Sequence, residues 1–383
     1  MQIIVHRGTN QIGGCATEIA TAKARIFIDF GAELNGNSNL DIDGVTKGNT
    51  NCSAIFFTHY HGDHIGLINS INKDIPCYIG SLSIDILKIQ NNRTKFIEPE
   101  RLSNIRPYYA GKAITIEDIT ITPYSVDHSA FDAHMFLIEA DGKRILHTGD
   151  FRTHGFRGKG LTKVIDKYIG DIDALICEGT TMSRSQHTSE TEYALSQKLR
   201  PILKENKYVF VACSSTNIDR LAAFHSAVPN GKYCICDRYQ KEIVDVVKEK
   251  SQHYSELYAF NKMLFYSKNL DHKLEDRGFV MFVRLGNPMF ERFMEKYKYK
   301  NPLLIYSMWH GYIDEQPKIK NAMDTYRSVE MHTSGHADFE SIKMLIEATH
   351  PKKVIPIHTE NAGAFTSISN SVILPKDKET IFI

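Results

Sequence analysis

The chain has 383 residues with 46 basic and 45 acidic side chains, a formal net charge of +1. This length exceeds the roughly 250–300 residues at which single cores stop growing, so two folded units are expected. The 42% hydrophobic and 24% charged content excludes a disordered or fibrous chain. Because no apolar run approaches the ~20 residues of a membrane helix, no membrane association is expected.

The cellular compartment can be inferred from the first residues and the cysteines. Met1–Arg7 lacks the cationic and apolar blocks of a signal peptide. The seven cysteines are odd in number and scattered, and Cys234 and Cys236 form only a CxC. This pattern favours free thiols in a reducing compartment over disulfides or a thiolate zinc site. We therefore expect a cytoplasmic protein.

Short β-rich runs alternate with amphipathic stretches along the whole chain, which predicts an α/β or α+β fold. In chain order, the expected strands are Gln2–Arg7, Thr17–Thr21, Arg25–Phe30, Ala54–Thr58, Ile114–Tyr124, His134–Glu139, Arg144–His147, Ala174–Glu178, Tyr208–Cys213, Phe279–Val283, Leu303–Tyr306 and Val354–Ile357. The expected helices are Leu82–Gln90, Glu190–Lys204, Ile218–Ala227, Lys241–Lys250, Gln316–Tyr326 and Phe339–Ala348.

The charge is unevenly divided along the chain. Residues 183–329 hold 23 basic and 17 acidic residues, a net of +6, which leaves a net of −5 for the remainder. The same segment contains the single tryptophan, Trp309, and the run Lys296-Tyr297-Lys298-Tyr299-Lys300. Such a pattern is typical of a solvated helical surface. Basic residues interleaved with aromatic rings also suit single-stranded nucleic acid, because bases stack on rings while cations contact phosphates.

A dense group of metal-binding residue types follows the apolar run Ala54–Phe57. The sequence Thr58-His59-Tyr60-His61-Gly62-Asp63-His64 places three histidines and one aspartate within six residues. Imidazole nitrogens and carboxylate oxygens are good ligands for zinc or manganese, and a turn after a strand lets neighbouring side chains converge. A metal site is therefore expected here.

Further ligand candidates stand at the ends of other expected strands. Asp127-His128 follows one strand, Asp150 follows Leu146–Gly149 with Gly149 allowing a tight turn, and His358 follows Val354–Ile357. Each of these residues alone is as compatible with a structural role as with metal binding. His134 and His147 compete with them, but His134 opens a strand and His147 lies within one.

These motifs together resemble the metallo-β-lactamase superfamily, and within it the RNA-metabolising β-CASP nucleases of the ribonuclease J type. Glu178 in Glu178-Gly179-Thr180-Thr181 resembles motif A, Ser334-Gly335-His336-Ala337-Asp338 resembles motif B, and Pro356-Ile357-His358-Thr359-Glu360 resembles motif C. The segment Ser214–Leu221, with Asn217, Asp219 and Arg220, is similar to a helix start in the β-CASP domain.

The resemblance implies a fold and a ligand set. The expected fold is α/β, a four-layer αβ/βα sandwich formed by residues 1–182 and 330–383, with an α/β β-CASP cap at 183–329 inserted and the active site in the cleft between them. Two divalent metal ions are implied, most readily zinc, with manganese as the alternative. The implied ligands are His59, His61 and His128 for one metal, Asp63, His64 and His358 for the other, Asp150 as a bridge, and Asp29 supporting the histidine loop.

The implied function is metal-dependent hydrolysis of RNA, endonucleolytic or 5′-exonucleolytic. A hydroxide activated by two metals would attack phosphorus, oriented by Asp63 and Asp150. His336 would protonate the leaving oxygen and Glu178 would keep it oriented and protonated. Asp338 is expected to be a helix N-cap. Ser334 and the backbone at Gly335 would bind a substrate phosphate or form an ordinary turn.

Several alternatives remain at this point. A DNA-acting nuclease would use the same residues, so single-stranded DNA is an alternative partner to RNA. A thioester, lactone or β-lactam hydrolase uses the same core, but the inserted basic segment and the pair of Glu178 and His336 disfavour it. A catalytically inactive RNA-binding scaffold is disfavoured because every ligand position is filled. A homodimer is left open.

Overall fold

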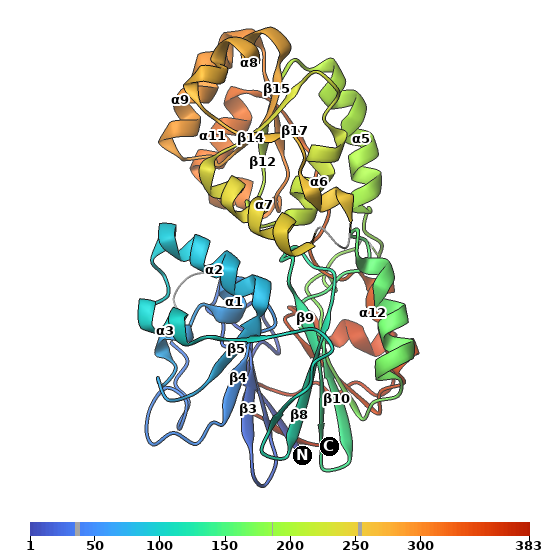
Figure 1. Cartoon of the computed structure of the whole chain (residues 1–383). Coiled ribbons are helices and arrows are strands. Elements are labelled where there is room, and N and C mark those ends of the chain that lie inside the picture. The colour runs from blue at the N-terminus through green and yellow to red at the C-terminus, as the bar shows by residue number, and fades with distance from the viewer. Residues whose placement is uncertain (35–38, 186, 252–254) are drawn as a thin grey trace. The chain divides into compact units, whose positions relative to one another are not determined.

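The computed structural model describes residues 1–34, 39–185, 187–251 and 255–383 (Figure 1). The chain forms two compact units. Unit 1 comprises Met1–Thr153, Arg157–Thr188 and Gly335–Ile383, and unit 2 comprises His154–Phe156 and Ser189–Ser334. Unit 2 is thus inserted into unit 1. Apart from the short segment His154–Phe156, the chain passes between the units at residues 188/189 and 334/335, where the sequence predicted boundaries at 182/183 and 329/330.

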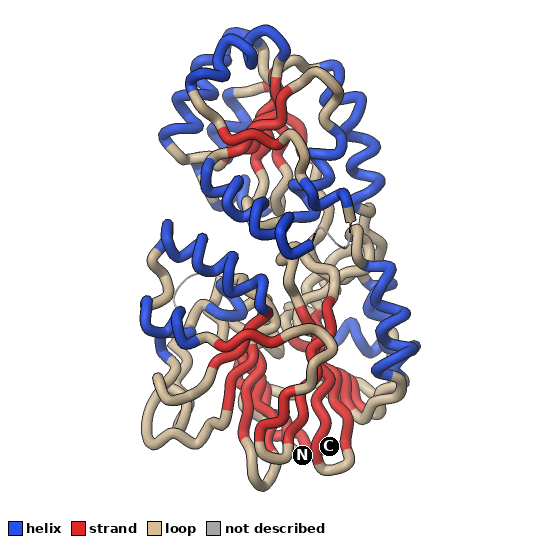
Figure 2. Tube along the Cα trace, in the orientation of Figure 1, coloured by secondary structure: helices blue, strands red, loops and turns tan. Residues whose placement is uncertain are grey.

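Unit 1 contains two sheets packed face to face (Figures 1 and 2). The strands of the seven-stranded sheet are, in spatial order, β19 (Thr380–Phe382), β1 (Gln2–Arg7), β2 (Ala16–Ala20), β3 (Arg25–Ile28), β4 (Ala54–Phe56), β5 (Cys77–Gly80) and β6 (Arg106–Tyr108). Those of the six-stranded sheet are β18 (Lys353–Ile357), β11 (Ala174–Glu178), β10 (Lys143–His147), β9 (His134–Ala140), β8 (Ile119–Ser125) and β7 (Ile114–Ile116).

Helices cover the outer faces of both sheets, which gives the four-layer αβ/βα sandwich expected from the sequence (Figure 1). The helices of unit 1 are α1 (Gly62–Ile65), α2 (Ser81–Thr94), α3 (Pro99–Asn104), α4 (Leu161–Val164) and α12 (Phe339–Thr349). The core lies between the sheets, where Ile28 and Phe56 of one sheet and Ile121 and Phe136 of the other are at most 1% exposed. Burying each such side chain stabilises the fold by about 1.5–3 kcal/mol.

The carboxyl ends of several strands meet at one edge of unit 1. β3, β4 and β5 are parallel neighbours in one sheet, and β10, β11 and β18 are parallel neighbours in the other. In α/β sheets, ligands bind beyond the carboxyl ends of parallel strands. Most of the expected metal ligands follow these strands. His128 follows β8, which runs in the same direction as β10 because each pairs antiparallel with β9, so the topology brings the ligands to a common edge.

One expected strand proved to be two. Ile114–Tyr124 was predicted as a single strand, but Glu117 adopts φ 53° and the chain turns back on itself, so that β7 and β8 pair antiparallel. Several short strands, such as β5 and β6, were not predicted. They contain only three or four residues, too few for an alternating pattern to stand out.

Unit 2 is built around a six-stranded sheet in which every pair of neighbours is parallel. The strands are, in spatial order, β14 (Met263–Phe265), β13 (Tyr233–Cys236), β15 (Phe279–Val283), β12 (Tyr208–Ala212), β16 (Leu303–Tyr306) and β17 (Arg327–Glu330). Its helices are α5 (Glu192–Glu205), α6 (Ile218–Ala227), α7 (Arg238–Ser251), α8 (Asp271–Arg277), α9 (Pro288–Tyr297), α10 (Gly311–Glu315) and α11 (Pro317–Thr325). They lie on both faces of the sheet (Figure 2), and the inner strands β12, β15 and β16 are accordingly apolar and buried along their whole length.

The aromatic and basic run at 296–300 has two structural roles. α9, which was not predicted, begins at an Asn287 cap, where the side chain accepts a hydrogen bond from the Met289 amide at 3.0 Å. Tyr297, at the end of this helix, is fully buried in the core of unit 2. Tyr299, in the short 3₁₀ turn η6 (Lys298–Lys300), is 92% exposed. Only the second tyrosine is therefore available to a partner.

The cysteines are free and buried, as expected. Across the described part of the chain, no helix has both the length and the apolar character required to cross a bilayer.

Candidate metal centre

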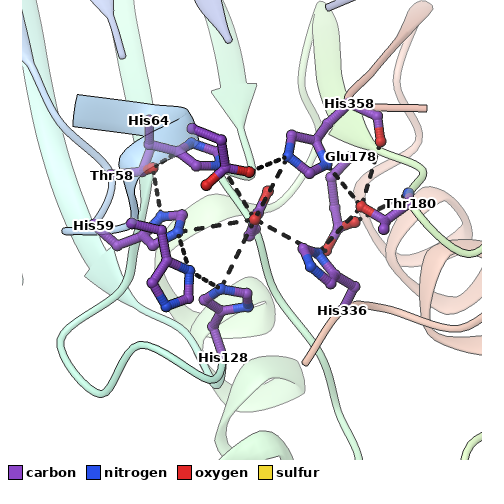
Figure 3. Close-up of polar contacts among 12 residues, drawn as sticks. Thr58, His59, His64, His128, Glu178, Thr180, His336 and His358 are labelled. Carbon is purple, nitrogen blue, oxygen red and sulfur yellow. Dashed lines mark hydrogen bonds and ion pairs between the residues drawn. The ribbon is translucent and has the colours of Figure 1, made fainter. Parts of the chain in front are cut away.

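The seven predicted metal ligands all lie in unit 1, beyond the ends of strands. His59, His61, Asp63 and His64 follow β4, the last two within α1. The others follow three strands of the second sheet: His128 comes after β8, Asp150 after β10 and His358 after β18. Figure 3 shows the imidazoles of His59, His64, His128, His336 and His358 directed toward a common centre.

Three histidines form a compact nitrogen cluster. His59 Nε2 lies 3.1 Å from His61 Nδ1, and His128 Nε2 lies 3.3 Å from the same atom. In a tetrahedral zinc site with Zn–N bonds of 2.0–2.1 Å, ligand nitrogens are about 3.3 Å apart. The spacing in this cluster therefore fits three ligands of one metal ion.

The protonation of this cluster favours metal binding. Burial lowers the pKa of His59 and His128 well below the ordinary value and lowers the pKa of His61 to about 4. His128 Nδ1 donates to the Gly335 carbonyl at 2.6 Å, so its Nε2 presents a lone pair. A ring nitrogen of a neutral imidazole that carries no proton presents a lone pair to a metal cation.

Asp150 stands at the centre of the histidines. Its Oδ2 lies 3.2 Å from His64 Nε2 and 3.5 Å from His336 Nδ1. The same oxygen is 3.8 Å from Nε2 of both His59 and His128, and 4.0 Å from His358 Nε2. Among the described residues, neither Asp150 oxygen has a hydrogen-bond partner of proper geometry. A buried carboxylate without such partners is costly, and a metal cation would satisfy it.

A second group of donors adjoins Asp150. Asp63 Oδ2 lies 3.1 Å from His358 Nε2 and 3.8 Å from His64 Nε2. Burial raises the pKa of Asp63, but His64 and the His358 hydrogen bond outweigh it, so the net pKa is low and the carboxylate stays charged. Two carboxylates and two imidazoles around one point are suitable ligands for zinc or manganese.

Asp29 supports this second group from behind. Its Oδ1 accepts a hydrogen bond from the Thr58 amide at 2.7 Å, and its Oδ2 accepts one from His64 Nδ1 at 2.8 Å. The second contact directs His64 Nε2 toward Asp150, as carboxylates do for metal-binding histidines. Asp29 and His358 both adopt a left-handed φ, 62° and 53°, and such strained positions concentrate at functional sites.

Hydroxyls orient two other histidines in the same way. His59 Nδ1 lies 3.0 Å from Thr58 Oγ1, and His358 Nδ1 lies 2.7 Å from Thr180 Oγ1. Thr180 Oγ1 is also 3.1 Å from His336 Nδ1. Sequence reasoning quoted Thr180 in motif A without assigning it a role, because a single threonine carries no signal of what it will contact.

His336 and Glu178 lie side by side at the edge of this cluster. His336 Nδ1 is 3.3 Å from Glu178 Oε1. Burial lowers the pKa of His336, but the charges of Glu178 and Asp150 outweigh it and raise the pKa to about 9. Glu178 is fully buried and also accepts hydrogen bonds from the backbone amides of Phe151 and Ala337, at 3.0 and 3.2 Å. These contacts fix its carboxylate.

The motif B residues have several different contacts. The Ser334 carbonyl accepts from His154 Nε2 at 2.8 Å, and the Gly335 carbonyl accepts from His128. A Cβ at Gly335 would lie 2.8 Å from Ser129 Oγ, so a larger residue there would displace the Ser129 side chain. Asp338 caps α12 through the Ser341 amide at 2.9 Å, as predicted.

The two histidines that competed for the site, His134 and His147, have their Nδ1 atoms engaged elsewhere. His147 Nδ1 accepts a hydrogen bond from the Gly149 amide at 3.1 Å. His134 Nδ1 contacts the Asp132 carbonyl at 3.0 Å, and its ring packs edge-on against Tyr108. Asp127 forms a fully buried ion pair with Arg152 at 2.8 Å. Cys15, which was not among the residues predicted for the site, has its sulfur within 4.8 Å of a ring nitrogen of both His64 and His358.

Two family models match this chain. Residues 24–204 match a beta-lactamase superfamily domain, and residues 327–365 match a Zn-dependent metallo-hydrolase RNA specificity domain. The first match contains six of the seven ligand candidates and the second contains His358. Residues 24–204 are thus similar to a metallo-β-lactamase superfamily domain. This match and the RNA specificity domain confirm the resemblance seen in the motifs.

Similar proteins support this placement. The chain is 22% identical to ribonuclease J of Helicobacter pylori J99 over 92% of its own length and 55% of that protein. It is 21% identical to ribonuclease J of Mycoplasma pneumoniae over 94% of its length and 68% of that protein. The chain thus spans about half the length of its Helicobacter relative. An Enterococcus faecalis V583 crystal structure described as a protein of unknown function superposes with a TM-score of 0.79 at 21% identity, covering 99% of each chain.

Proposed function

We propose that this chain is a metal-dependent phosphodiester hydrolase that cleaves RNA. The observation that carries the proposal is the convergence of five imidazoles on the Asp150 carboxylate, with His336 and Glu178 at one side. The similarity to ribonuclease J enzymes and the RNA specificity domain support RNA as the substrate class.

Two divalent cations are proposed, zinc first and manganese as the alternative. His59, His61 and His128 would hold one of them, Asp63, His64 and His358 the other, and Asp150 would contact both. Such ions, when bound, polarise a phosphoryl group and lower the pKa of water. A bound cation would satisfy the Asp150 oxygens, neither of which has a hydrogen-bond partner among the described residues.

The protein's own contribution is a positioned proton donor. The contacts of His336 Nδ1 with Glu178 Oε1 and Thr180 Oγ1 place the Nδ1 proton toward those oxygens, and the second ring nitrogen then remains for substrate. When water attacks phosphorus and the P–O bond breaks, the leaving oxygen takes a proton from this nitrogen. Glu178 stabilises the imidazolium, which keeps the acid charged before the step. Ser334 and Gly335 are proposed to contact a neighbouring phosphate.

The decisive experiment compares His336→Ala with the wild type on end-labelled RNA resolved on gels. We expect cleavage to fall at least 100-fold, the usual minimum for a general acid, while metal content measured by mass spectrometry is unchanged. His272→Ala, an exposed histidine in α8, is the matched control and should behave as wild type. Loss of both metals in His336→Ala would contradict the proposed role.

The same gels separate the remaining alternatives. RNA with 5′-phosphate and 5′-hydroxyl ends distinguishes endonucleolytic from 5′-exonucleolytic cleavage, and a matching single-stranded DNA tests the DNA-acting alternative. Each of these three substrates is incubated with the protein in the presence and in the absence of a chelator. A protein that binds metal, leaves every nucleic acid intact and hydrolyses a thioester or lactone would be the small-molecule hydrolase instead.

A further inference from the structure

Each of the six parallel strands of unit 2 begins beside a basic residue. Lys207, Lys232 and Lys262 directly precede β12, β13 and β14, and Arg327 is the first residue of β17. Arg277 and Lys300 stand two and three residues before β15 and β16. We call these six residues the cation row; in the order of the strands they are Lys262, Lys232, Arg277, Lys207, Lys300 and Arg327.

The strand register places these residues at one edge of the sheet. Tyr208 pairs with Phe279, Tyr233 also pairs with Phe279, and Leu303 pairs with Arg327, so the strands start level with one another. At about 4.8 Å between strands, the row extends over roughly 24 Å. Side-chain positions agree: the Lys207 and Lys300 ammonium groups lie 5.5 and 5.9 Å from the centre of the Tyr208 ring. Lys232 and Arg277 line one surface hollow.

Most of the row carries uncompensated charge. Within the described ranges, Lys207, Lys232, Lys262, Arg277 and Arg327 form no ion pair with a carboxylate. Lys300 pairs with Glu275 at 3.4 Å. The six strand starts, counted with the five residues before each, contain eight basic and four acidic residues, a net of +4. Most of the +6 carried by residues 183–329 is therefore concentrated at this edge.

An aromatic ring stands at the same edge. Tyr299 is 92% exposed and precedes Lys300 directly. Its neighbour Tyr297 is buried in the core and fixes the chain beneath it. A line of cations with an exposed ring is the combination that holds a single strand, because phosphates contact the cations and a base stacks on the ring.

Some residues of the cation row can be explained by stabilisation of helix carboxyl ends, with no bound ligand. Helices precede most of these strands, and cations stabilise helix carboxyl ends. Lys232 plainly does this, because its ammonium group donates to the Leu203 and Asn206 carbonyls at the end of α5. Lys207 and Lys262 are exposed and have no side-chain hydrogen bond to a carbonyl among the described residues. A capping role therefore does not account for them.

We infer that the cation row and Tyr299 form a second contact surface for single-stranded RNA. It lies at the opposite edge of the unit 2 sheet from residues 331–334, which lead into motif B. The inference rests on the proposed function, since it assigns a holding surface to the substrate of the same enzyme. RNA bound there would be retained in addition to the segment at the metal centre.

The test measures binding of a labelled 25-residue oligouridylate by fluorescence anisotropy, in the metal-loaded His336→Ala protein so that cleavage is slow. The variant replaces Lys207, Lys262 and Arg327 by Gln. For single strands, the logarithm of the binding constant falls with the logarithm of the salt concentration by about 0.7 per phosphate contact. Removing three cations should therefore reduce the magnitude of this slope by about 2. Between 50 and 200 mM salt, the loss of affinity should accordingly be roughly 18-fold smaller than in the parent protein.

The matched control replaces three exposed lysines of unit 1, Lys23, Lys112 and Lys163, by Gln, which removes the same charge. We expect its salt slope to equal that of the parent. Equal slopes in all three proteins would overturn the inference. A row variant that melts earlier but binds RNA normally would also overturn it, by showing that these cations only stabilise helix ends.

Tyr299→Ala separates RNA from any other polyanion. Stacking on an aromatic ring contributes about 1–3 kcal/mol per base, so oligouridylate binding should weaken at least fivefold. Binding of inorganic polyphosphate should not change, and Tyr109→Ala, another exposed tyrosine, should change neither. Equal effects on both ligands would contradict the assignment to RNA. A wild type that binds RNA through the row but cleaves none would contradict the proposed function alone.

Discussion

Thr180 shows how one hydroxyl can orient two groups of the proposed site. Its Oγ1 contacts His358 Nδ1 at 2.7 Å and His336 Nδ1 at 3.1 Å. The first contact orients a proposed metal ligand and the second orients the proposed acid. Removing the hydroxyl should therefore affect the metal and the proton donor together.

We expect Thr180→Val to weaken metal affinity by about 10–100-fold, the usual cost of losing a partner behind a ligand. Valine keeps the shape of threonine, so the fold should be retained. Titration with zinc against a competing chelator measures the affinity. Thr349→Val is the control, because Thr349 is equally buried and bonds only the Leu345 carbonyl in α12. Equal affinities for both variants would show that Thr180 does not orient His358.

The candidate ligand residues could be proposed from the sequence, because three histidines and an aspartate within six residues rarely have a structural purpose. Their supporting contacts could not. Thr180 lies 156 residues from His336 and 178 from His358 along the chain, and only the folded chain brings them together. His128 Nδ1 likewise donates to the Gly335 carbonyl. Because every residue has a backbone carbonyl, the residue type does not predict such a contact.

At the level of elements, the run 296–300 shows that an aromatic pattern in the sequence does not tell which rings are buried and which are exposed. Tyr297 and Tyr299 are two residues apart, yet one is buried and the other is exposed, because α9 ends between them. The buried Tyr297 Oη has no hydrogen-bond partner among the described residues. An unsatisfied buried hydroxyl is destabilising.

Tyr297→Phe should therefore raise the free energy of unfolding by about 1 kcal/mol. Tyr306→Phe should lower it by about the same amount, because the Tyr306 hydroxyl donates to the Trp309 carbonyl at 3.0 Å. Urea denaturation followed by tryptophan fluorescence is suitable, since the single tryptophan, Trp309, lies in unit 2. Destabilisation by Tyr297→Phe would mean that its hydroxyl has a partner.

The start of α12 connects helix stability with the proposed acid. The Asp338 carboxylate caps the helix through the Ser341 amide, and His336 stands two residues before it. Asp338→Ala should cost about 1 kcal/mol of stability and should reduce cleavage, whereas Asp338→Asn should retain most of both. Thermal unfolding and the RNA gel measure the two effects. Full activity with a lowered melting temperature would show that the cap acts on the helix alone.

Strands with long apolar runs were predictable with their bounds. Ala174–Glu178 and Phe279–Val283 are found as expected, because both are central strands buried on two faces. Edge strands such as β6, with two of its three residues exposed, carry no such signal. α9 could have been predicted from its Asn287-Pro288 start, which is typical of a helix N-terminus.

At the level of the whole molecule, metal and fold should be coupled in unit 1 but not in unit 2. The proposed ligands come from both sheets of unit 1, so a bound ion would join the two layers. Ligand binding to the native state stabilises it, by about 4 kcal/mol at a thousandfold excess over Kd.

Chelation should therefore increase amide exchange around residues 59–64 and 357–359 and leave β12 and β15 of unit 2 unchanged. Hydrogen exchange followed by mass spectrometry on proteins with and without chelator measures this directly. Faster exchange in both units would contradict a metal site confined to unit 1.

The insertion of unit 2 also affects the order in which the parts of unit 1 are synthesised. β1 pairs with β19, and His358 follows β18, so unit 1 combines the first and last parts of the chain. A ribosome must synthesise all of unit 2 before it adds His358, the last of the proposed metal ligands. The growing chain therefore has no complete candidate centre, and the messenger being read is not exposed to the proposed nuclease activity, until residue 358 has been made.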